Sequence, residues 1–232
     1  MAGDEIIFGL PSKGRLKEQC EAWLVKRGLF LKQTGGERGY AAHFDGEPMV
    51  EVRLMSSSEI SKSLLAGEMH LGITGEDLIR EQSPKSDEQV EFVHKLGFGR
   101  ADVVVAVPDG WIDVSTMGDL AEVASDIRRT SGKRMRIATK FARLTTEFFE
   151  KCGVLDYRIV YSGSATEGAP ANGIAEAIVD ITTSGATLIA NNLKIIDDGL
   201  ILSSQACLIK SRTAILSPKQ SALMNELTRK FG

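Results

Sequence analysis

The chain of 232 residues is long enough for one large α/β domain or for two small lobes. Its 43% hydrophobic and 25% charged residues are typical of a globular protein, and its net charge of −3 argues against general nucleic-acid binding. The three cysteines are widely spaced, form no CxxC pair and are odd in number, which favours a reducing compartment. No apolar run approaches the roughly 20 residues of a membrane span, and the first ten residues lack the basic start of a signal peptide. We therefore expect a cytoplasmic location.

The first predicted strand covers Glu5–Leu10 and is followed by the basic turn Lys13-Gly14-Arg15. Apolar residues at helical spacing from Leu16 to Leu24 predict a helix after this turn, with Ser12 as its N-cap. The turn is therefore expected at the carboxyl edge of a sheet, where open α/β sheets bind ligands. A solvated basic turn without a ligand is the alternative for this stretch.

Two further predicted strands end beside charged residues. The strand His70–Thr74 is followed by Gly75, Glu76 and Asp77, where a helix begins. Asp77 can accept hydrogen bonds from a ligand, or it can simply stabilise the first helical turn. The strand Arg134–Thr139 ends at Lys140, and Arg100 stands between two other predicted strands.

The stretch from Ala177 to Asn191 has the strongest phosphate-binding character. Its β-branched residues predict a buried strand that carries Asp180 near its end. The loop that follows is small and rich in hydroxyl groups, and it leads into a predicted helical turn. Backbone amides and hydroxyls at such a turn can hold a phosphate, although ordinary turns share this pattern. Upstream, residues 163–170 with Glu167 predict a loop before a helix that contains Ile174 and Ala177.

Strands alternate with helices almost throughout, which predicts an α/β fold with a mostly parallel sheet in each of two lobes. We place lobe I at 1–104 plus 208–232 and lobe II at 105–207, and we expect a turn at Asp197-Asp198-Gly199. The P-loop, dinucleotide-fold, zinc-protease and GxSxG patterns are all absent from the sequence. Cations and acids at several strand ends nevertheless suit a highly phosphorylated substrate.

Six motifs in the expected order give the whole chain a resemblance to the ATP phosphoribosyltransferases, the first enzymes of histidine biosynthesis. These motifs are Leu10–Leu16, Gly72–Leu78, Arg136–Lys140, Thr166–Pro170, Ala177–Ile181 and Thr183–Asn191. The resemblance implies the two-lobed fold of type II periplasmic binding proteins. It also implies a reaction in which N1 of the ATP adenine attacks C1 of phosphoribosyl pyrophosphate, with inversion and loss of pyrophosphate. Mg²⁺ is expected to bridge the pyrophosphate.

The resemblance also implies roles for individual residues. Lobe II is expected to hold phosphoribosyl pyrophosphate and lobe I the nucleotide. The residues implied to bind phosphoribosyl pyrophosphate are Asp180, Thr183, Ser184, Gly185, Ala186 and Thr187. The residues implied to bind ATP are Lys13, Gly14, Arg15, Asp77, Arg100 and Lys140. Glu167 and Asp180 are the expected catalytic residues, with Asp180 near the ribose hydroxyls or a hydrated Mg²⁺, and helix capping is the alternative for Glu167. The metal ligands stay unassigned.

One departure from the family pattern concerns a cation. Many relatives carry an arginine where this chain has the segment Met55–Ser61, so that contact is missing or replaced by Arg53. We expect the short form of the family, without a C-terminal regulatory domain. The resemblance then implies a homodimer within a hetero-oligomer, whose partner is a regulatory protein similar to histidyl-tRNA synthetase. Three alternatives stay open: a cytoplasmic small-ligand-binding protein of the same fold, another phosphoribosyltransferase class, and an interaction module.

Overall fold

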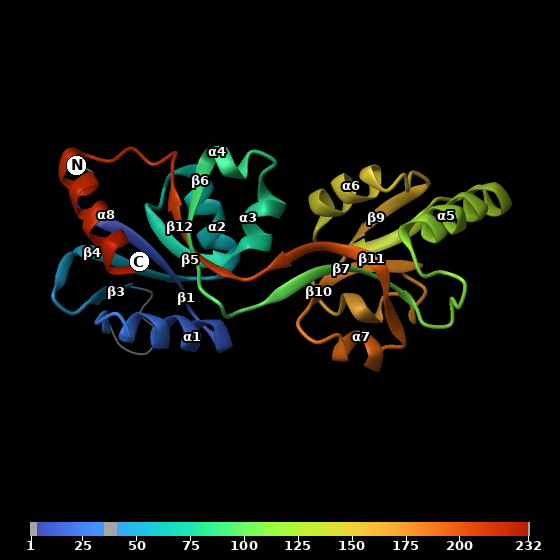
Figure 1. Cartoon of the computed structure of the whole chain (residues 1–232), viewed down its shortest axis with the longest axis horizontal. Coiled ribbons are helices and arrows are strands. Elements are labelled where there is room, and N and C mark those ends of the chain that lie inside the picture. Colours follow the sequence, from blue (N-terminus) through green and yellow to red (C-terminus); the bar gives the residue numbers. More distant parts are fainter. Residues whose placement is uncertain (1–3, 35–40, 232) are drawn as a thin grey trace. The chain divides into compact units, whose positions relative to one another are not determined.

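The computed structural model describes residues 4–34 and 41–231, and it divides into two compact units (Figure 1). Unit 1 comprises Met1–Gly99 with Gln205–Gly232, and unit 2 comprises Arg100–Ser204. Arg100 falls in unit 2, where its carbonyl accepts a hydrogen bond from the Thr183 hydroxyl at 3.1 Å. The chain passes from unit 1 to unit 2 after Gly99 and returns after Ser204, in both cases a few residues before the predicted boundaries at 104 and 207.

Unit 1 is built on a mixed sheet with the strand order β2-β3-β4-β1-β5-β12-β6. The parallel strands β4, β1 and β5 form its core, and the remaining neighbours pair antiparallel. The strands are β1 (Ile6–Pro11), β2 (Leu31–Thr34), β3 (Ala41–Phe44), β4 (Glu47–Met55), β5 (Leu71–Gly75), β6 (Val90–Lys95) and β12 (Ala206–Ser211). The helices are α1 (Gly14–Val25), α2 (Ser57–Ala66), α3 (Glu76–Gln82), α4 (Ser86–Gln89) and α8 (Pro218–Phe231).

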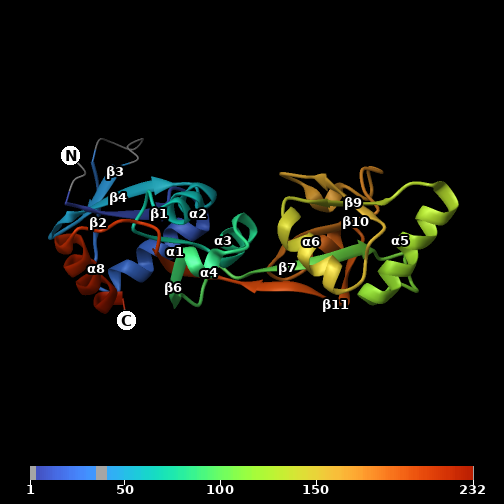
Figure 2. The ribbon, with the colours of Figure 1, turned by 90° about the horizontal axis from the view of Figure 1, so that it is seen from above.

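Alternate residues of β1 face two different helical layers of unit 1. Phe8 is fully buried in a core that includes Leu24 of α1 and Phe231 of α8. On the other face Ile7 packs with α2 and α3, around Ile60. Both layers are visible in Figure 2. The period of two along the strand therefore places helices on both faces of the sheet.

Unit 2 repeats this design with the strand order β11-β7-β10-β8-β9. Strands β10, β8 and β9 run parallel, whereas β7 pairs antiparallel with β10 and β11. The strands are β7 (Ala101–Pro108), β8 (Met135–Thr139), β9 (Tyr157–Tyr161), β10 (Ala177–Thr182) and β11 (Leu193–Ser204). The helices are α5 (Met117–Ser131), α6 (Ala142–Lys151), the 3₁₀ turn η1 (Thr166–Gly168) and α7 (Ala186–Ala190). The predicted α/β class is confirmed: the parallel strands β4, β1 and β5 lie at the centre of the unit 1 sheet, and β10, β8 and β9 form one side of the unit 2 sheet.

Three local predictions are wrong. The N-cap of α1 is Lys13 rather than Ser12, and it has no side-chain hydrogen bond to the helix. No helix forms over 174–177, since Ala177 begins β10 opposite Ile137. The predicted turn at 197–199 lies inside β11, which pairs with β7 through an irregular register at that point. None of the helices within 4–34 and 41–231 is long and apolar enough to cross a membrane.

Candidate active site

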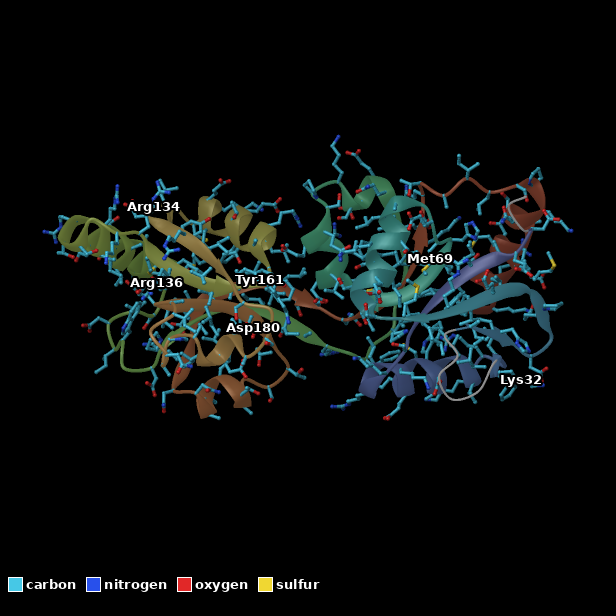
Figure 3. All side chains as sticks on the ribbon, turned by 180° about the vertical axis from the view of Figure 1, so that it is seen from behind. Lys32, Met69, Arg134, Arg136, Tyr161 and Asp180 are labelled. Carbon is cyan, nitrogen blue, oxygen red and sulfur yellow. The ribbon has the colours of Figure 1, made fainter. Side chains whose placement is uncertain are left out.

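The carboxyl edge of the unit 2 sheet brings Lys140 and Asp180 together. In the parallel pair β8–β10, Ile178 stands opposite Ala138; Asp180 lies two residues further along β10, and Lys140 directly follows the last residue of β8. The Lys140 Nζ and an Asp180 carboxylate oxygen are 3.8 Å apart. The Asp180 side chain is only 15% exposed, so the charge pair is largely withdrawn from water. Figure 3 labels Asp180 and Tyr161, which ends β9, the strand on the other side of β8.

The environment of Asp180 raises the pKa of its carboxyl group above the ordinary value. Burial is the main cause, and the nearby Glu167 carboxylate acts in the same direction. The Ile181 amide, at 2.8 Å, and the Lys140 ammonium oppose the shift without cancelling it. Asp180 is therefore a carboxylate whose negative charge is costly until a cation or hydrogen-bond donor arrives.

The loop between β10 and α7 is held by its own hydroxyl groups. The Thr182 hydroxyl accepts a hydrogen bond from the Gly185 amide at 2.8 Å, and the Ser184 hydroxyl accepts one from the Ala186 amide at 3.4 Å. Gly185 has a φ of 75°, which a glycine adopts without steric cost. Thr187 is exposed in the first turn of α7, where amides have no carbonyl partner within the helix. The loop is small, preformed and open to an anion.

Glu167 lies in the 3₁₀ turn η1, after Ala165 in the left-handed conformation with φ 52°. The neighbouring Thr166 is buried, its hydroxyl lies 3.1 Å from the Ser162 hydroxyl, and it is one of the groups that lower the pKa of Asp180. The turn η1 packs against β10. Glu167 therefore belongs to the same cluster as Asp180 and Lys140.

The acids of this cluster fit a metal that arrives with a substrate better than a resident ion. Among the described residues, no group of three or more His, Cys, Asp or Glu side chains is placed to hold a metal. Mg²⁺ in phosphate-transferring sites is commonly held by one or two carboxylates together with substrate phosphates and waters. Asp180 and Glu167 supply that number.

The carboxyl edge of the unit 1 sheet collects the other predicted residues. Strands β1, β4 and β5 run parallel, so α1, α2 and α3 all begin at this edge. Lys13 and Arg15 are exposed beside the start of α1, which carries no acid in its first turn and no side-chain cap. Ser12 and Lys13 also line a pocket of about 480 Å³ with Met55, Ser56 and others. Positive charge and open helix amides therefore coincide here, as an anion requires.

Asp77 is buried in the first turn of α3, at the end of β5. Its carboxylate lies against Gly75 so closely that a Cβ at position 75 would stand 2.3 Å from its Oδ1. Glycine at position 75 therefore leaves the space that this carboxylate occupies. The predicted set thus divides into Lys13, Gly14, Arg15 and Asp77 in unit 1, and Arg100, Lys140, Glu167, Asp180 and the loop 183–187 in unit 2.

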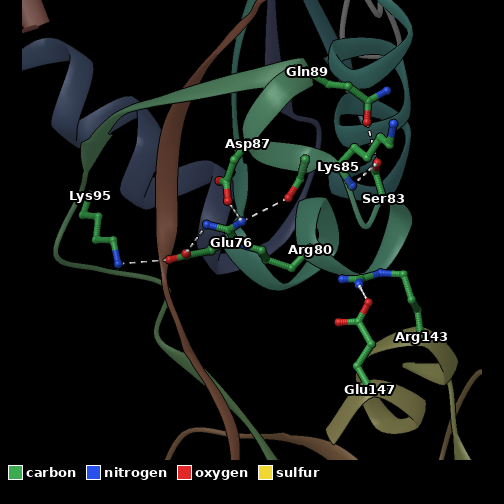
Figure 4. A network of polar contacts seen from close by, with 10 residues as sticks. Glu76, Arg80, Ser83, Lys85, Asp87, Gln89, Lys95, Arg143 and Glu147 are labelled. Carbon is green, nitrogen blue, oxygen red and sulfur yellow. Dashed lines mark hydrogen bonds and ion pairs between the residues drawn. The ribbon is translucent and has the colours of Figure 1, made fainter.

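Sequence reasoning missed a network of charges next to Asp77 (Figure 4). The buried Glu76 is 3.1 Å from Lys95 Nζ and 3.6 Å from Arg80, and Arg80 also contacts Asp87 at 2.7 Å. The i, i+4 spacing of Glu76 and Arg80 on a predicted helix could have indicated their ion pair. Their contacts with Lys95 and Asp87 depend on tertiary structure and have no local signal.

Arg53, the residue that could replace the missing family cation, forms an ion pair with Glu51 at 2.7 Å. One further feature escaped the sequence reasoning. Tyr161 is 78% exposed at the carboxyl end of β9, where it offers a flat apolar face. A tyrosine at the end of a predicted strand looks like a core residue, so no sequence signal marked its exposure.

The chain has the fold of two-lobed periplasmic-binding-protein-like α/β proteins. A chain of the "ATP phosphoribosyl transferase (HisG:HisZ) complex from Thermotoga maritima" superposes with a TM-score of 0.72 at 22% identity, covering 97% of this chain and 96% of that one. The periplasmic aliphatic sulphonate binding protein SsuA from Escherichia coli gives a TM-score of 0.54 at 16% identity, over 98% of this chain and 71% of the other. These likenesses establish the fold.

Sequence comparisons establish the family. The family model "HisG: ATP phosphoribosyltransferase" matches residues 56–231. A curated ATP phosphoribosyltransferase of Caulobacter vibrioides is 55% identical over 209 residues, which are 90% of this chain and 65% of that protein. One of Mesorhizobium japonicum is 51% identical over 225 residues, 97% of each chain. The chain belongs to the ATP phosphoribosyltransferase family, and it spans about 65% of the length of the Caulobacter relative.

Proposed function

We propose that this chain is the catalytic subunit of an ATP phosphoribosyltransferase, a pentosyltransferase that performs the first step of histidine biosynthesis. It joins adenine N1 of ATP to C1 of phosphoribosyl pyrophosphate and releases pyrophosphate. The observation that supports this proposal best is the cluster of Lys140, Asp180 and the loop 183–187 at one sheet edge, in a chain of this family. Relatives named for this activity include one that matches the chain along 97% of its length.

On the donor side, the loop from Thr183 to Thr187 holds the 5-phosphate of phosphoribosyl pyrophosphate. Small side chains and first-turn amides suit a phosphate, and the left-handed Gly185 fixes the loop shape before the ligand binds. Asp180 faces the ribose hydroxyls, and their donated hydrogen bonds offset the cost of its buried charge. Glu167, close enough to influence Asp180, contacts the reacting sugar or the adenine.

On the nucleotide side, the basic turn Lys13-Gly14-Arg15 holds ATP phosphates, and Asp77 accepts hydrogen bonds from the nucleotide. Lys140 and Arg100 supply further phosphate contacts from unit 2. Adenine N1 is a weak neutral nucleophile, so the rate depends on positioning of the two substrates and on stabilisation of the leaving pyrophosphate. The cations named here provide that stabilisation.

Asp180 and Glu167 are the side chains that would hold a Mg²⁺ ion bound together with the donor, and the ion would supply positive charge to stabilise the leaving pyrophosphate. Because no group of three or more metal-binding side chains gathers within residues 4–34 and 41–231, removal of Mg²⁺ is expected to abolish turnover without unfolding the protein.

We also propose a cytoplasmic location and a regulatory partner. All three thiols are free, as a reducing compartment favours. The structural neighbour from Thermotoga maritima is a chain from a HisG:HisZ complex, and its length matches this chain. Histidine feedback would then act through a partner similar to histidyl-tRNA synthetase, in a hetero-oligomer built on a homodimer of this chain.

The test is an assay with ATP, phosphoribosyl pyrophosphate and Mg²⁺, with pyrophosphatase added to draw the reaction forward. We expect the absorbance of phosphoribosyl-ATP to rise, with the chain alone or with the regulatory partner. No product in either case would refute the activity. Binding of ATP or the donor without product would favour the small-ligand-binding alternative.

A further inference from the structure

A second cationic site lies in unit 2, away from the cluster of Lys140 and Asp180. A pocket of about 730 Å³ opens between the carboxyl end of α5 and the starts of β8 and β9. Its charged lining comprises Arg128, Lys133, Arg134, Arg136, Arg158 and Glu176. Figure 3 shows Arg134 and Arg136 near α5, with Asp180 and Tyr161 further along the same sheet.

Four of the five cations in this pocket have no acidic partner among the described residues, and three of these four make no side-chain hydrogen bond either. Glu176 is committed to Arg136: its carboxylate accepts from the Arg136 Nε at 3.0 Å and from the Arg136 backbone amide at 2.6 Å. Arg128 donates to the carbonyl of Gly132. Lys133, Arg134 and Arg158 are exposed and form no ion pair within 4–34 and 41–231. Three positive charges thus remain open to a ligand.

The strand register makes this concentration of charge costly without a ligand. Arg136 and Arg158 are direct partners in the parallel pair β8–β9, and like charges placed opposite each other destabilise a sheet. Glu176 offsets one of these charges only. The chain as a whole carries a net charge of −3, so general basicity does not explain the pocket. An anion bound here would remove the repulsion.

We propose that this pocket binds a diphosphate group, either as inorganic pyrophosphate or as part of a nucleoside diphosphate. A diphosphate carries about three negative charges near neutral pH, which matches the three unpaired cations, and arginine forks suit phosphate oxygens. The volume lies in the range of small-molecule sites. The site is separate from the proposed donor and ATP residues, and the proposal does not depend on the proposed function.

Isothermal titration of the whole chain with pyrophosphate, in the absence of Mg²⁺, tests the site. The variant Arg134→Ala/Arg158→Ala should bind one diphosphate fewer than the wild type, whether or not the proposed active site also binds one. The matched control is Arg129→Ala/Lys151→Ala, which removes two exposed cations of the same unit outside the pocket. The control should keep the wild-type stoichiometry.

A second titration with ADP distinguishes the two sources of the diphosphate, since a nucleotide site should bind ADP at least tenfold more tightly than pyrophosphate. Equal stoichiometry in the wild type and the double variant would overturn the proposal, as would an equal loss in the control. If the circular dichroism spectrum shows that the double variant is unfolded, the single variant Arg158→Gln is used in its place. This variant should bind pyrophosphate at the pocket about tenfold more weakly than the wild type. Binding of poly-glutamate with no binding of either diphosphate would also overturn the proposal, in favour of an acidic protein surface.

Discussion

At the residue scale, the ionised carboxylate of Asp180 destabilises the fold. Burial and the Glu167 carboxylate raise the pKa of its carboxyl group, so the folded state holds this proton more tightly than the unfolded state does. The stability of the fold must then fall as pH rises from the unfolded pKa through the higher folded pKa. At neutral pH the ionised group is a net cost to folding.

The variant Asp180→Asn should therefore gain thermal stability at neutral pH while losing activity. We expect a higher Tm at pH 7 and a smaller gain in Tm near pH 3. Activity should fall by about 10²-fold or more, because the proposed contact with the substrate loses its charge. Thermal melts across pH 3–8 and steady-state rates measure both effects. Asp113→Asn, an exposed acid of the same unit, is the control and should change neither. A lower Tm at pH 7 would contradict this account of Asp180.

The contact between Gly75 and Asp77 leads to a second prediction. The variant Gly75→Ala keeps an ordinary backbone conformation, since φ at this residue is −72°, but its Cβ displaces the Asp77 carboxylate. We expect the KM for ATP to rise about tenfold, with the KM for phosphoribosyl pyrophosphate unchanged. Gly110→Ala, where an added Cβ has no neighbour within 4 Å, should leave both constants as they are. An unaltered KM for ATP would remove Asp77 from the nucleotide side.

At the scale of elements, the loop before α7 depends on the left-handed conformation of Gly185. In Gly185→Ala the new Cβ has space, with its nearest neighbour 4.0 Å away, so only the backbone conformation is penalised, by about 1 kcal/mol. Gly153→Ala has the same penalty, at φ 74° and with no neighbour. Urea unfolding should show a similar loss for both variants. Only Gly185→Ala should raise the KM for phosphoribosyl pyrophosphate, and an equal KM in the two variants would separate the loop from the donor.

Elements with their own local signals could be predicted from the sequence, and those decided by strand pairing could not. The capping box of Ser56 and Glu59 and the left-handed Gly67 mark both ends of α2 within the chain itself. By contrast, the segment before Ala177 has helical spacing, yet pairing of β10 with β8 and β7 makes Ala177 a strand residue. The acids at 197–198 resemble a turn, but the segment stays within β11, and Asp198 accepts a hydrogen bond from the Met117 amide at 2.7 Å.

The same distinction holds for the candidate site. Lys140 and Asp180 could each be predicted at a strand end, because charged residues after apolar runs are visible locally. Their meeting at 3.8 Å requires the register between β8 and β10, which no local pattern encodes. The roles proposed for the predicted binding and catalytic residues stay predictions until the kinetic tests are done.

At the scale of the whole molecule, each unit has its own buried core, and a core defect should act mainly in its own unit. Phe8 is fully buried between Phe44 and Phe231, with ring centroids 5.5 and 5.9 Å away. Phe8→Ala should cost about 3–5 kcal/mol. Hydrogen exchange should accelerate in β1, β4 and β5 much more than in β8 and β10. Phe149→Ala, in the core of unit 2, is the reciprocal control, and uniform acceleration in both variants would show a single cooperative core.

We propose that the donor depends chiefly on the unit 2 loop and ATP chiefly on the basic turn of unit 1, with Lys140 and Arg100 adding phosphate contacts from unit 2. The most direct measurement is the KM for both substrates in Thr187→Trp and in Lys13→Ala/Arg15→Ala. The control for Thr187→Trp is Ile189→Trp, at an exposed position of α7. The control for the double variant is Lys26→Ala, an exposed cation at the end of α1. The account predicts that Thr187→Trp raises the KM for phosphoribosyl pyrophosphate at least tenfold with little change for ATP, and that the double variant does the reverse. Equal increases for both substrates in either variant, or the opposite assignment, would contradict it.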